Sequence, residues 1–195
     1  VIEKIHLTFP EAIVSIDTYR SEVAKQAVQA GATMVNDISG GTLDSKMLKT
    51  VGALGVPYVA MHMQGTPQNM QKNPTYEDIL VTLRHFFITK IAAAHKAGIH
   101  DIILDPGFGF GKTLEHNYAI LNHLKSLQIE GTPILIGVSR KSMIYKLLHI
   151  DVTDALNGTT VLNTVALQRG AQILRVHDVK EAQQAVQLLE KLKMA

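Results

Sequence analysis

The chain has 195 residues, of which 46% are hydrophobic and 18% are charged. These proportions are typical of one well-packed globular domain and exclude a disordered chain. The 19 Lys and Arg residues nearly balance the 17 Asp and Glu residues, and no basic run is longer than Arg140-Lys141. We therefore expect no nucleic-acid-binding face of the kind that depends on bulk positive charge.

The chain contains no cysteine, which excludes disulfides, thiolate metal sites and cysteine nucleophiles. This composition agrees with a cytoplasmic location, where thiols stay reduced. No apolar run approaches the roughly 20 residues that a membrane helix needs, and no signal-peptide pattern opens the chain. The first residue is Val1 rather than Met, so we expect the natural N-terminus to lie upstream.

Six short apolar runs recur along the chain, and each ends in polar or glycine-rich residues. They predict strands at residues 12–16, 33–35, 56–61, 101–104, 133–138 and 172–176. Their apolarity is continuous rather than alternating, which is typical of parallel strands that are buried on both faces of a sheet.

Helical patterns alternate with these runs. Residues 1–10 resemble the end of a helix, and amphipathic periodicity predicts further helices at residues 21–30, 76–97, 154–169 and 179–194. Three of the helices end in similar punctuation, at residues 30–32, 97–99 and 169–171, with a glycine in the middle position. A glycine at this position is the common way for a helix to end before the next strand.

The alternation amounts to six βα units and predicts an α/β fold with a parallel sheet, either open or closed into a barrel. Polar residues follow all six strands, which favours the barrel, because an open sheet concentrates its functional groups at one switch point. A complete (β/α)8 TIM barrel needs about 250 residues. We therefore expect residues 1–195 to form a single domain, the C-terminal three-quarters of such a barrel without its first two strands.

The strand ends supply the candidate functional residues. In a closed barrel one mouth would receive Asp17, Asn36, Asp105, Ser139, Lys141, Arg175 and His177. Carboxylate and amide groups can pair with the donors and acceptors along the edge of a flat heterocycle. Lysine, arginine and histidine suit an anion such as a phosphate or a carboxylate. The substrate should therefore be polar at both ends.

Each candidate also has a purely structural interpretation. Asp17 is equally suited to cap the following helix, and Asn36-Asp37 to form a turn. Residues 139–141 are compatible with an ordinary helix start that carries solvated charges. His177 is compatible with a strand-end histidine, and His62, which methionines flank, fits that interpretation better than a functional one.

The glycine-rich segment at residues 105–113 matches no nucleotide motif. Gly111-Lys112-Thr113 resembles the end of a P-loop, but Pro106 stands where the first glycine is required. The spacing of its glycines also fails the dinucleotide-binding pattern. The alternating glycines let the loop lie flat, with Phe108 and Phe110 projecting. One ring would then either cover an aromatic ligand or pack against the base of the loop.

At these residues the sequence resembles the dihydropteroate synthase family of pterin-binding barrels. Six motifs occur in the order of that family, one for each predicted strand. They are residues 15–19, 35–41, 61–67, 105–112, 137–141 and 175–178. Together they cover nearly the whole chain, so the joint match is specific.

The resemblance implies roles for individual residues. The pterin pocket would contain Asp17, Asn36, Ile38, Met61, Asp105, Gly137 and Lys141. Phe110, Ser139 and Lys141 would bind p-aminobenzoate, where sulfonamides bind in this family, and Arg175 and His177 would bind diphosphate. The implied catalytic residues are Asp105, Lys141, Arg175 and His177.

The implied reaction joins 6-hydroxymethyl-7,8-dihydropterin diphosphate to p-aminobenzoate, giving 7,8-dihydropteroate and diphosphate, with Mg2+ as cofactor. The resemblance further implies a homodimer through late helices. The family's first two strand-end loops, which carry the metal-side asparagine, have no counterpart here, so we expect no metal ligand in this chain. We also expect open sheet edges, low stability and no activity from residues 1–195 alone.

Two alternatives remain open. A methyltetrahydrofolate-binding domain of corrinoid methyltransferases would share the barrel and the pterin pocket but has no diphosphate to expel. Its chemistry therefore does not require the cation set formed by Ser139-Arg140-Lys141 and by Arg175 with His177. A non-catalytic pterin-binding paralogue would not need Asp105, Lys141, Arg175 and His177. A metal-dependent barrel hydrolase is disfavoured, because no His-x-His pair follows any strand.

Overall fold

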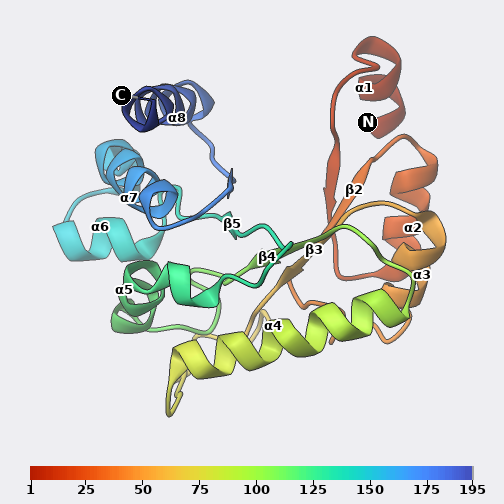
Figure 1. Cartoon of the computed structure of the whole chain (residues 1–195), viewed down its shortest axis with the longest axis horizontal. Helices are drawn as coiled ribbons and strands as arrows, with labels where there is room; N and C mark the ends of the chain where they lie inside the picture. Colours follow the sequence, from red (N-terminus) through yellow and green to blue (C-terminus); the bar gives the residue numbers. More distant parts are fainter. Residues whose placement is uncertain (195) are drawn as a thin grey trace. The chain divides into compact units, whose positions relative to one another are not determined.

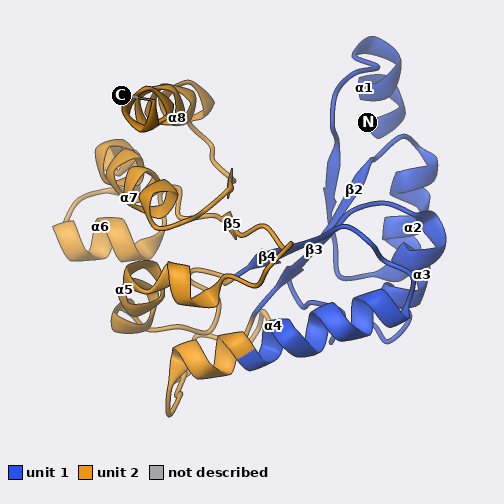
Figure 2. Ribbon diagram, in the orientation of Figure 1, with its two compact units in different colours: residues 1–62, 85–105 blue, residues 63–84, 106–195 orange. Residues whose placement is uncertain are grey.

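A computed structural model describes residues 1–194 (Figure 1). The chain divides into two compact units, one formed by Val1–His62 and His85–Asp105 and the other by Met63–Arg84 and Pro106–Ala195 (Figure 2). Helix α4 contributes residues to both units. The single domain expected over residues 1–195 stays a prediction.

Unit 1 contains a four-stranded parallel sheet. Its order is β1 (Ser15–Asp17), β2 (Met34–Asp37), β3 (Tyr58–Met61) and β4 (Ile102–Asp105). The helices of this unit are α1 (Ile2–Thr8), α2 (Ser21–Gln29), α3 (Met47–Leu54) and the part of α4 (Ile79–Lys96) from His85 on. Every residue of β3 and β4 is buried, which explains why the sequence of these two strands shows no alternation of polar and apolar residues.

Helix α2 shows how the unit combines local and long-range contacts. Ala24 and Ala27 of its apolar stripe are buried, whereas Val23 of the same stripe is 40% exposed. Its N-terminus is capped from a distance, since the backbone N–H of Ser21 donates to Asp44 Oδ2 at 2.7 Å. The preceding residue, Arg20, makes no capping bond with its side chain.

Unit 2 contains a two-stranded parallel sheet of β5 (Leu135–Ile136) and β6 (Ile173–Leu174). Its helices include α5 (Leu114–Asn122), α6 (Ser142–Leu148), α7 (Leu156–Gln168) and α8 (Val179–Lys193), with short 3-10 turns η1 (Leu124–Leu127) and η2 (Val152–Asp154). Helix α7 packs against α8 and α6 (Figure 1). The core of the unit includes Phe108, Leu124, Ile136 and Val138, all fully buried.

The alternation of strands and helices and the parallel pairing confirm the predicted class. The three predicted helix ends are also confirmed, because Gly31, Gly98 and Gly170 all have a φ between 87° and 108° that other residues rarely adopt. Helices α3, α5 and α6 were not identified by periodicity. Within residues 1–194, no helix combines the length and the apolarity that crossing a lipid bilayer requires.

Candidate active site

In unit 1 the strand register brings four of the predicted residues to one face of the sheet. Asn36 lies in register with Asp17 of β1 and with Val59 of β3, which in turn pairs with Ile103 of β4. Residues two apart on a strand share a face. Met61, two residues after Val59, and Asp105, two residues after Ile103, therefore lie on the same face as Asp17 and Asn36.

These side chains lie at the carboxyl ends of adjacent strands. Met61 and Asp105 are directly in register, and the backbone N–H of His62 donates to the carbonyl of Asp105 at 3.0 Å. Asp105 and Met61 are fully buried and Asn36 is 5% exposed, whereas Asp17 is exposed. Ile38, just beyond β2, is half-buried. A carboxylate and an amide thus lie deep on this face beside an apolar side chain.

Asp37, the residue after Asn36, points to the opposite face of the same sheet. Its carboxylate accepts hydrogen bonds from Ser39, through both the backbone N–H and the hydroxyl, from the N–H of Gly41, and from the Tyr58 hydroxyl at 2.7 Å. Burial, reinforced by the charge of Asp37, strongly raises the pKa of Tyr58, which therefore stays a proton donor. The turn interpretation of Asn36-Asp37 thus holds for Asp37 but does not extend to Asn36.

In unit 2 the pairing of β5 and β6 continues beyond the last strand residues. Leu135 pairs with Ile173 and Ile136 with Leu174, an offset of 38 residues. At the same offset, Ser139 Oγ accepts the backbone N–H of His177 at 3.2 Å and lies 3.0 Å from its Nδ1. The guanidinium of Arg175 lies against Gly137, which has no side chain to displace it. Arg175 is half-buried and His177 is exposed.

Lys141 connects the β5–α6 loop to the glycine-rich loop after β4. Its ammonium donates to the carbonyl of Phe108 and lies 4.9 Å from the centre of the Phe110 ring. Phe108 is fully buried, so the expectation that both rings project is wrong for this residue. Phe110 is half-buried and presents its ring to a cation, an arrangement that a ring and an ammonium favour.

Comparisons with known proteins identify the family. A family profile described as "Pterin binding enzyme" matches residues 1–177. The chain is 40% identical over 192 residues to the dihydropteroate synthase of Escherichia coli K12, covering 97% of this chain and 67% of that enzyme. It is 43% identical over 182 residues to the Synechocystis enzyme of the same name, covering 92% of this chain and 63% of that enzyme.

The chain belongs to the dihydropteroate synthase family of pterin-binding enzymes.

Solved structures extend the match to three dimensions. The Yersinia pestis dihydropteroate synthase in complex with a sulfonamide drug aligns with a TM-score of 0.95 at 39% identity, over 100% of this chain and 71% of that one. The Xanthomonas albilineans enzyme in complex with 7,8-dihydropteroate aligns with a TM-score of 0.92 at 35% identity, over 100% and 74%. These matches confirm the predicted family and the (β/α)8 class, of which this chain carries six βα units. It spans about two thirds of the length of the curated relatives quoted above.

Within this family member each unit gathers its own share of the predicted residues. Unit 1 brings together Asp17, Asn36, Ile38, Met61 and Asp105, and unit 2 brings together Phe110, Gly137, Ser139, Lys141, Arg175 and His177. That all of them face one barrel mouth stays a prediction. His62 is 6% exposed and its ring packs edge-on against Phe86 at 4.9 Å, as a structural histidine would.

The structure joins Arg140, which the sequence counts only within a set of cations, to Asp178, to which the sequence gives no role of its own. Arg140 and Asp178, each next to a predicted site residue, form a bidentate ion pair with distances of 2.9 and 3.0 Å. The interpretation of residues 139–141 as a helix start with solvated charges is therefore wrong for Arg140. Arg140 and Asp178 are separated by 38 residues, the same separation as the paired residues of β5 and β6. This separation becomes visible only when the strand register is known.

The described residues do not fit a metal centre. Within residues 1–194, no cluster of three or more His, Asp or Glu side chains is arranged to hold an ion. The expectation of Mg2+ as cofactor stays a prediction, and no chemical step derived from these residues passes through it.

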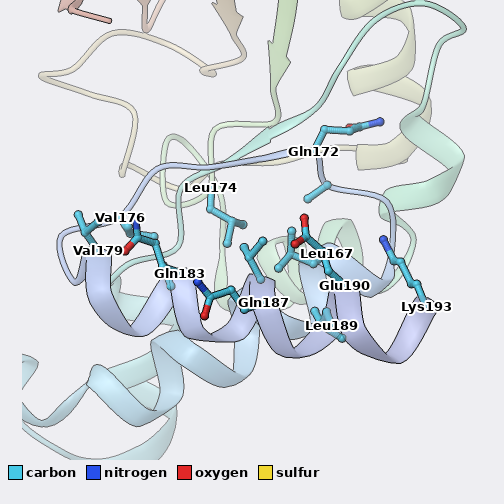
Figure 3. Close-up of a pocket in the computed structure, with 13 residues that line it drawn as sticks. Leu167, Gln172, Leu174, Val176, Val179, Gln183, Gln187, Leu189, Glu190 and Lys193 are labelled. Carbon is cyan, nitrogen blue, oxygen red and sulfur yellow. The ribbon is translucent and has the colours of Figure 1, made fainter. Parts of the chain in front are cut away.

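A cavity of about 620 Å³ lies in unit 2, and its lining includes Val176, which stands between the predicted residues Arg175 and His177. Figure 3 shows Leu174 and Val176 on one side of it and Gln183, Gln187 and Glu190 of α8 on the other. None of the predicted site residues lines it. Its lining is mainly aliphatic and amide side chains, and its two charged residues, Glu190 and Lys193, have opposite sign, so the cavity presents no cluster of cations to an anionic substrate.

Proposed function

We propose that the protein to which this chain belongs carries out the dihydropteroate synthase reaction, the joining of 6-hydroxymethyl-7,8-dihydropterin diphosphate to p-aminobenzoate with release of diphosphate. The proposal rests most directly on the common face of Asp17, Asn36 and Asp105 in unit 1. Amide and carboxylate groups on one face match the amino, imino and oxo edge of a pterin. Met61, buried beside Asp105, provides an apolar surface for the ring.

In this reaction one bond forms and one bond breaks. The neutral amine nitrogen of p-aminobenzoate forms a bond with the methylene carbon of the pterin, and the bond from that carbon to the diphosphate oxygen breaks. The oxygen keeps the electron pair, and the amine releases one proton to solvent. An aromatic amine is neutral at pH 7, so the difficult step is the departure of the anion rather than activation of the nucleophile.

Each unit has a part in that step. Arg175 and His177 would bind the diphosphate and stabilise the charge that develops on the leaving oxygen. Lys141 would attract the carboxylate of p-aminobenzoate and approach the pterin, with Ser139 and Phe110 completing the p-aminobenzoate site. Asp105, as a buried carboxylate, would stabilise the pterin ring as it becomes electron-poor. Gly137 would leave room for these groups.

Further properties of the family are part of the proposal without support from the geometry. They are Mg2+ as cofactor, a homodimer, a cytoplasmic location and sensitivity to sulfonamides. The steps above do not depend on any of them. A relative bound to a sulfonamide drug supports the last one.

Calorimetry on the whole protein that carries this sequence tests the proposal. We expect p-aminobenzoate to bind when diphosphate is present and to bind at least about tenfold more weakly without it, since diphosphate would complete the site. The variant Arg175→Gln should abolish that dependence, and Arg169→Gln, an exposed arginine of the same unit, should preserve it. Equal binding with and without diphosphate would contradict a synthase and favour a pterin protein that expels no anion.

A further inference from the structure

The side chain of Arg140 is fully engaged within the protein. Its Nε donates to Asp178 Oδ2 at 3.0 Å and its Nη2 to Asp178 Oδ1 at 2.9 Å. Its Nη1 donates to the backbone carbonyls of Thr153 at 2.7 Å and Val152 at 3.3 Å. All three nitrogens of the guanidinium donate hydrogen bonds within the protein, and Asp178 neutralises its charge. Arg140 is therefore poorly placed to bind an anion directly.

The backbone of Arg140 is held as firmly as its side chain. Its φ is 50°, in the left-handed region that residues other than glycine rarely adopt. Its N–H donates to Thr159 Oγ1 at 3.0 Å, and that hydroxyl donates to the carbonyl of Ala155 at 2.8 Å. An unfavourable backbone conformation persists only where the surrounding contacts fix it, and such residues cluster at functional sites.

The neighbours of this pair are the groups assigned to the leaving group and the amine substrate. Arg140 lies between Ser139 and Lys141, and Asp178 follows His177. Ser139 contacts His177, and Arg140 contacts Asp178, at the same separation of 38 residues. Two successive side-chain contacts, Ser139 with His177 and Arg140 with Asp178, therefore join the two loops. The bidentate pair of Arg140 and Asp178 is called the fork below.

We propose that Arg140 is a positioning residue for diphosphate, acting through Asp178 to hold His177 against Ser139. This proposal rests on the proposed function. A bidentate arginine–carboxylate pair fixes orientation as well as distance, because two parallel hydrogen bonds resist rotation. The Arg140 and Asp178 side chains are 27% and 19% exposed, and pairs near the surface contribute little to stability. The pair should therefore affect the geometry of the site more than the stability of the fold.

The state of Asp178 is consistent with this role. Its pKa is lowered, first by the hydrogen bond from Arg140 and further by the charges of Arg140 and His177. The carboxylate is thus ionised throughout the neutral range, so the fork does not titrate where the enzyme would work. The negative charges of Glu181 and Asp154 also act on Arg140. The carboxylate that accepts the two hydrogen bonds of the fork is that of Asp178.

A double-mutant cycle in the whole protein tests the proposal. Arg140→Gln, Asp178→Asn and the double variant are compared by calorimetry for inorganic diphosphate and for 6-hydroxymethylpterin, which has no diphosphate. We expect each single variant to bind diphosphate between about tenfold and about a hundredfold more weakly, as a small misplacement of binding groups does. The double variant should be no weaker than the weaker single variant, and pterin affinity should stay within about twofold.

Two further variants separate the fork from the backbone. Arg140→Gly keeps the left-handed conformation without strain and removes the guanidinium, so it should lose diphosphate affinity as Arg140→Gln does. Arg140→Lys restores the charge without the fork and should recover only part of the affinity. Arg169→Gln, which removes an exposed arginine from the same unit, should bind both ligands normally.

The outcomes are distinguishable. Failure of the unmodified protein to bind diphosphate would overturn the proposed function and this inference with it. Normal diphosphate binding by Arg140→Gln or Arg140→Gly, or equal losses of pterin and diphosphate affinity in Asp178→Asn, would overturn the positioning role alone. A selective loss of diphosphate affinity, shared by both partners and partly recovered by lysine, supports it.

Discussion

Nη2 of Arg175 lies 2.9 Å from the point where a Cβ on residue 137 would stand. Gly137 is therefore the residue that lets the guanidinium lie across the end of β5. The contact follows the β5–β6 register, because the N–H of Arg175 donates to the carbonyl of Ile136 at 2.8 Å. A residue assigned to the pterin pocket by resemblance thus contacts a residue assigned to diphosphate.

Gly137→Ala should displace the Arg175 guanidinium without unfolding the protein, because the obstructing atoms belong to the end of a flexible side chain. We expect diphosphate affinity to fall about tenfold, equivalent to about 1.4 kcal/mol. Calorimetry with inorganic diphosphate measures the change.

Gly158→Ala is the matched control. Its added methyl would meet Ile144 Cγ2 at 2.4 Å in the packing between α6 and α7, so it should lower the melting temperature and leave diphosphate affinity nearly unchanged. If both variants lose the same affinity, the effect of Gly137→Ala is general destabilisation rather than displacement of Arg175.

Asp105→Asn keeps the shape of a fully buried side chain and removes its charge. Hydrogen bonds to a charged group are worth about 1.5 to 3 kcal/mol, so we expect pterin affinity to fall between about tenfold and about a hundredfold. The melting temperature should change little, since the variant no longer buries a charge. Asp101→Asn, exposed at the other end of β4, is the control. Pterin binding by Asp105→Asn at the unmodified affinity would remove Asp105 from the pocket.

Tyr58→Phe removes the hydroxyl that donates to Asp37 on the opposite face of the sheet. The buried carboxylate would keep its bonds from Ser39 and Gly41, so we expect a loss of about 1 to 2 kcal/mol in the free energy of unfolding. Urea denaturation measures it, with Tyr145→Phe, on α6, as the control. Pterin affinity should not change. A selective effect on pterin would mean that the two faces of the sheet are not functionally separate.

Asp44 should make stability depend on pH through its bond to the N-terminus of α2. Its pKa is lowered, mainly by hydrogen bonds from the side chain and the backbone of Ser21. Because the folded pKa lies below the unfolded value of about 3.9, the carboxylate stabilises the fold above that value. This stabilisation is lost as the pH falls through the folded pKa. Asp44→Asn should therefore be less stable than the unmodified protein at pH 7.

Urea denaturation at several pH values checks this expectation. The stability gap between the unmodified protein and Asp44→Asn should narrow as the pH falls below about 4. Glu11→Gln, an exposed residue in a loop, is the control and should show no comparable narrowing. A gap that is constant from pH 7 to pH 3 would show that the charge of Asp44 contributes nothing.

Much of the fold could be predicted because buried segments consist mainly of apolar residues. Strands β3 and β4 are buried on both faces, so they appear as unbroken apolar runs, and the glycines that end α2, α4 and α7 mark the loops that follow. Helix α6 was harder to identify, because it has only seven residues and no side-chain cap. Short helices depend on their packing rather than on their own sequence.

The sequence predicts which residue types form the site but not how these residues pair. Asn36 and Asp37 are adjacent and therefore point to opposite faces of the sheet. The register of Asn36 with Asp17 and Val59 is needed to show that Asn36 lies on the face of the predicted site. The partnership of Arg140 with Asp178 crosses 38 residues, so no local pattern indicates it. Family resemblance supplied roles for individual residues, whereas the contacts that hold those residues in place came from three-dimensional structure alone.

The shared register of the β5–α6 and β6–α8 loops limits how their lengths can vary. Deleting one residue from either loop would shift every following side chain to the wrong partner, as a slip of one residue does in any sheet. Changes in length during divergence should therefore be rarer in these two loops than elsewhere in unit 2. Changes near Ser139, which resemblance assigns to the p-aminobenzoate site, would then arise by replacement of side chains rather than by insertion or deletion.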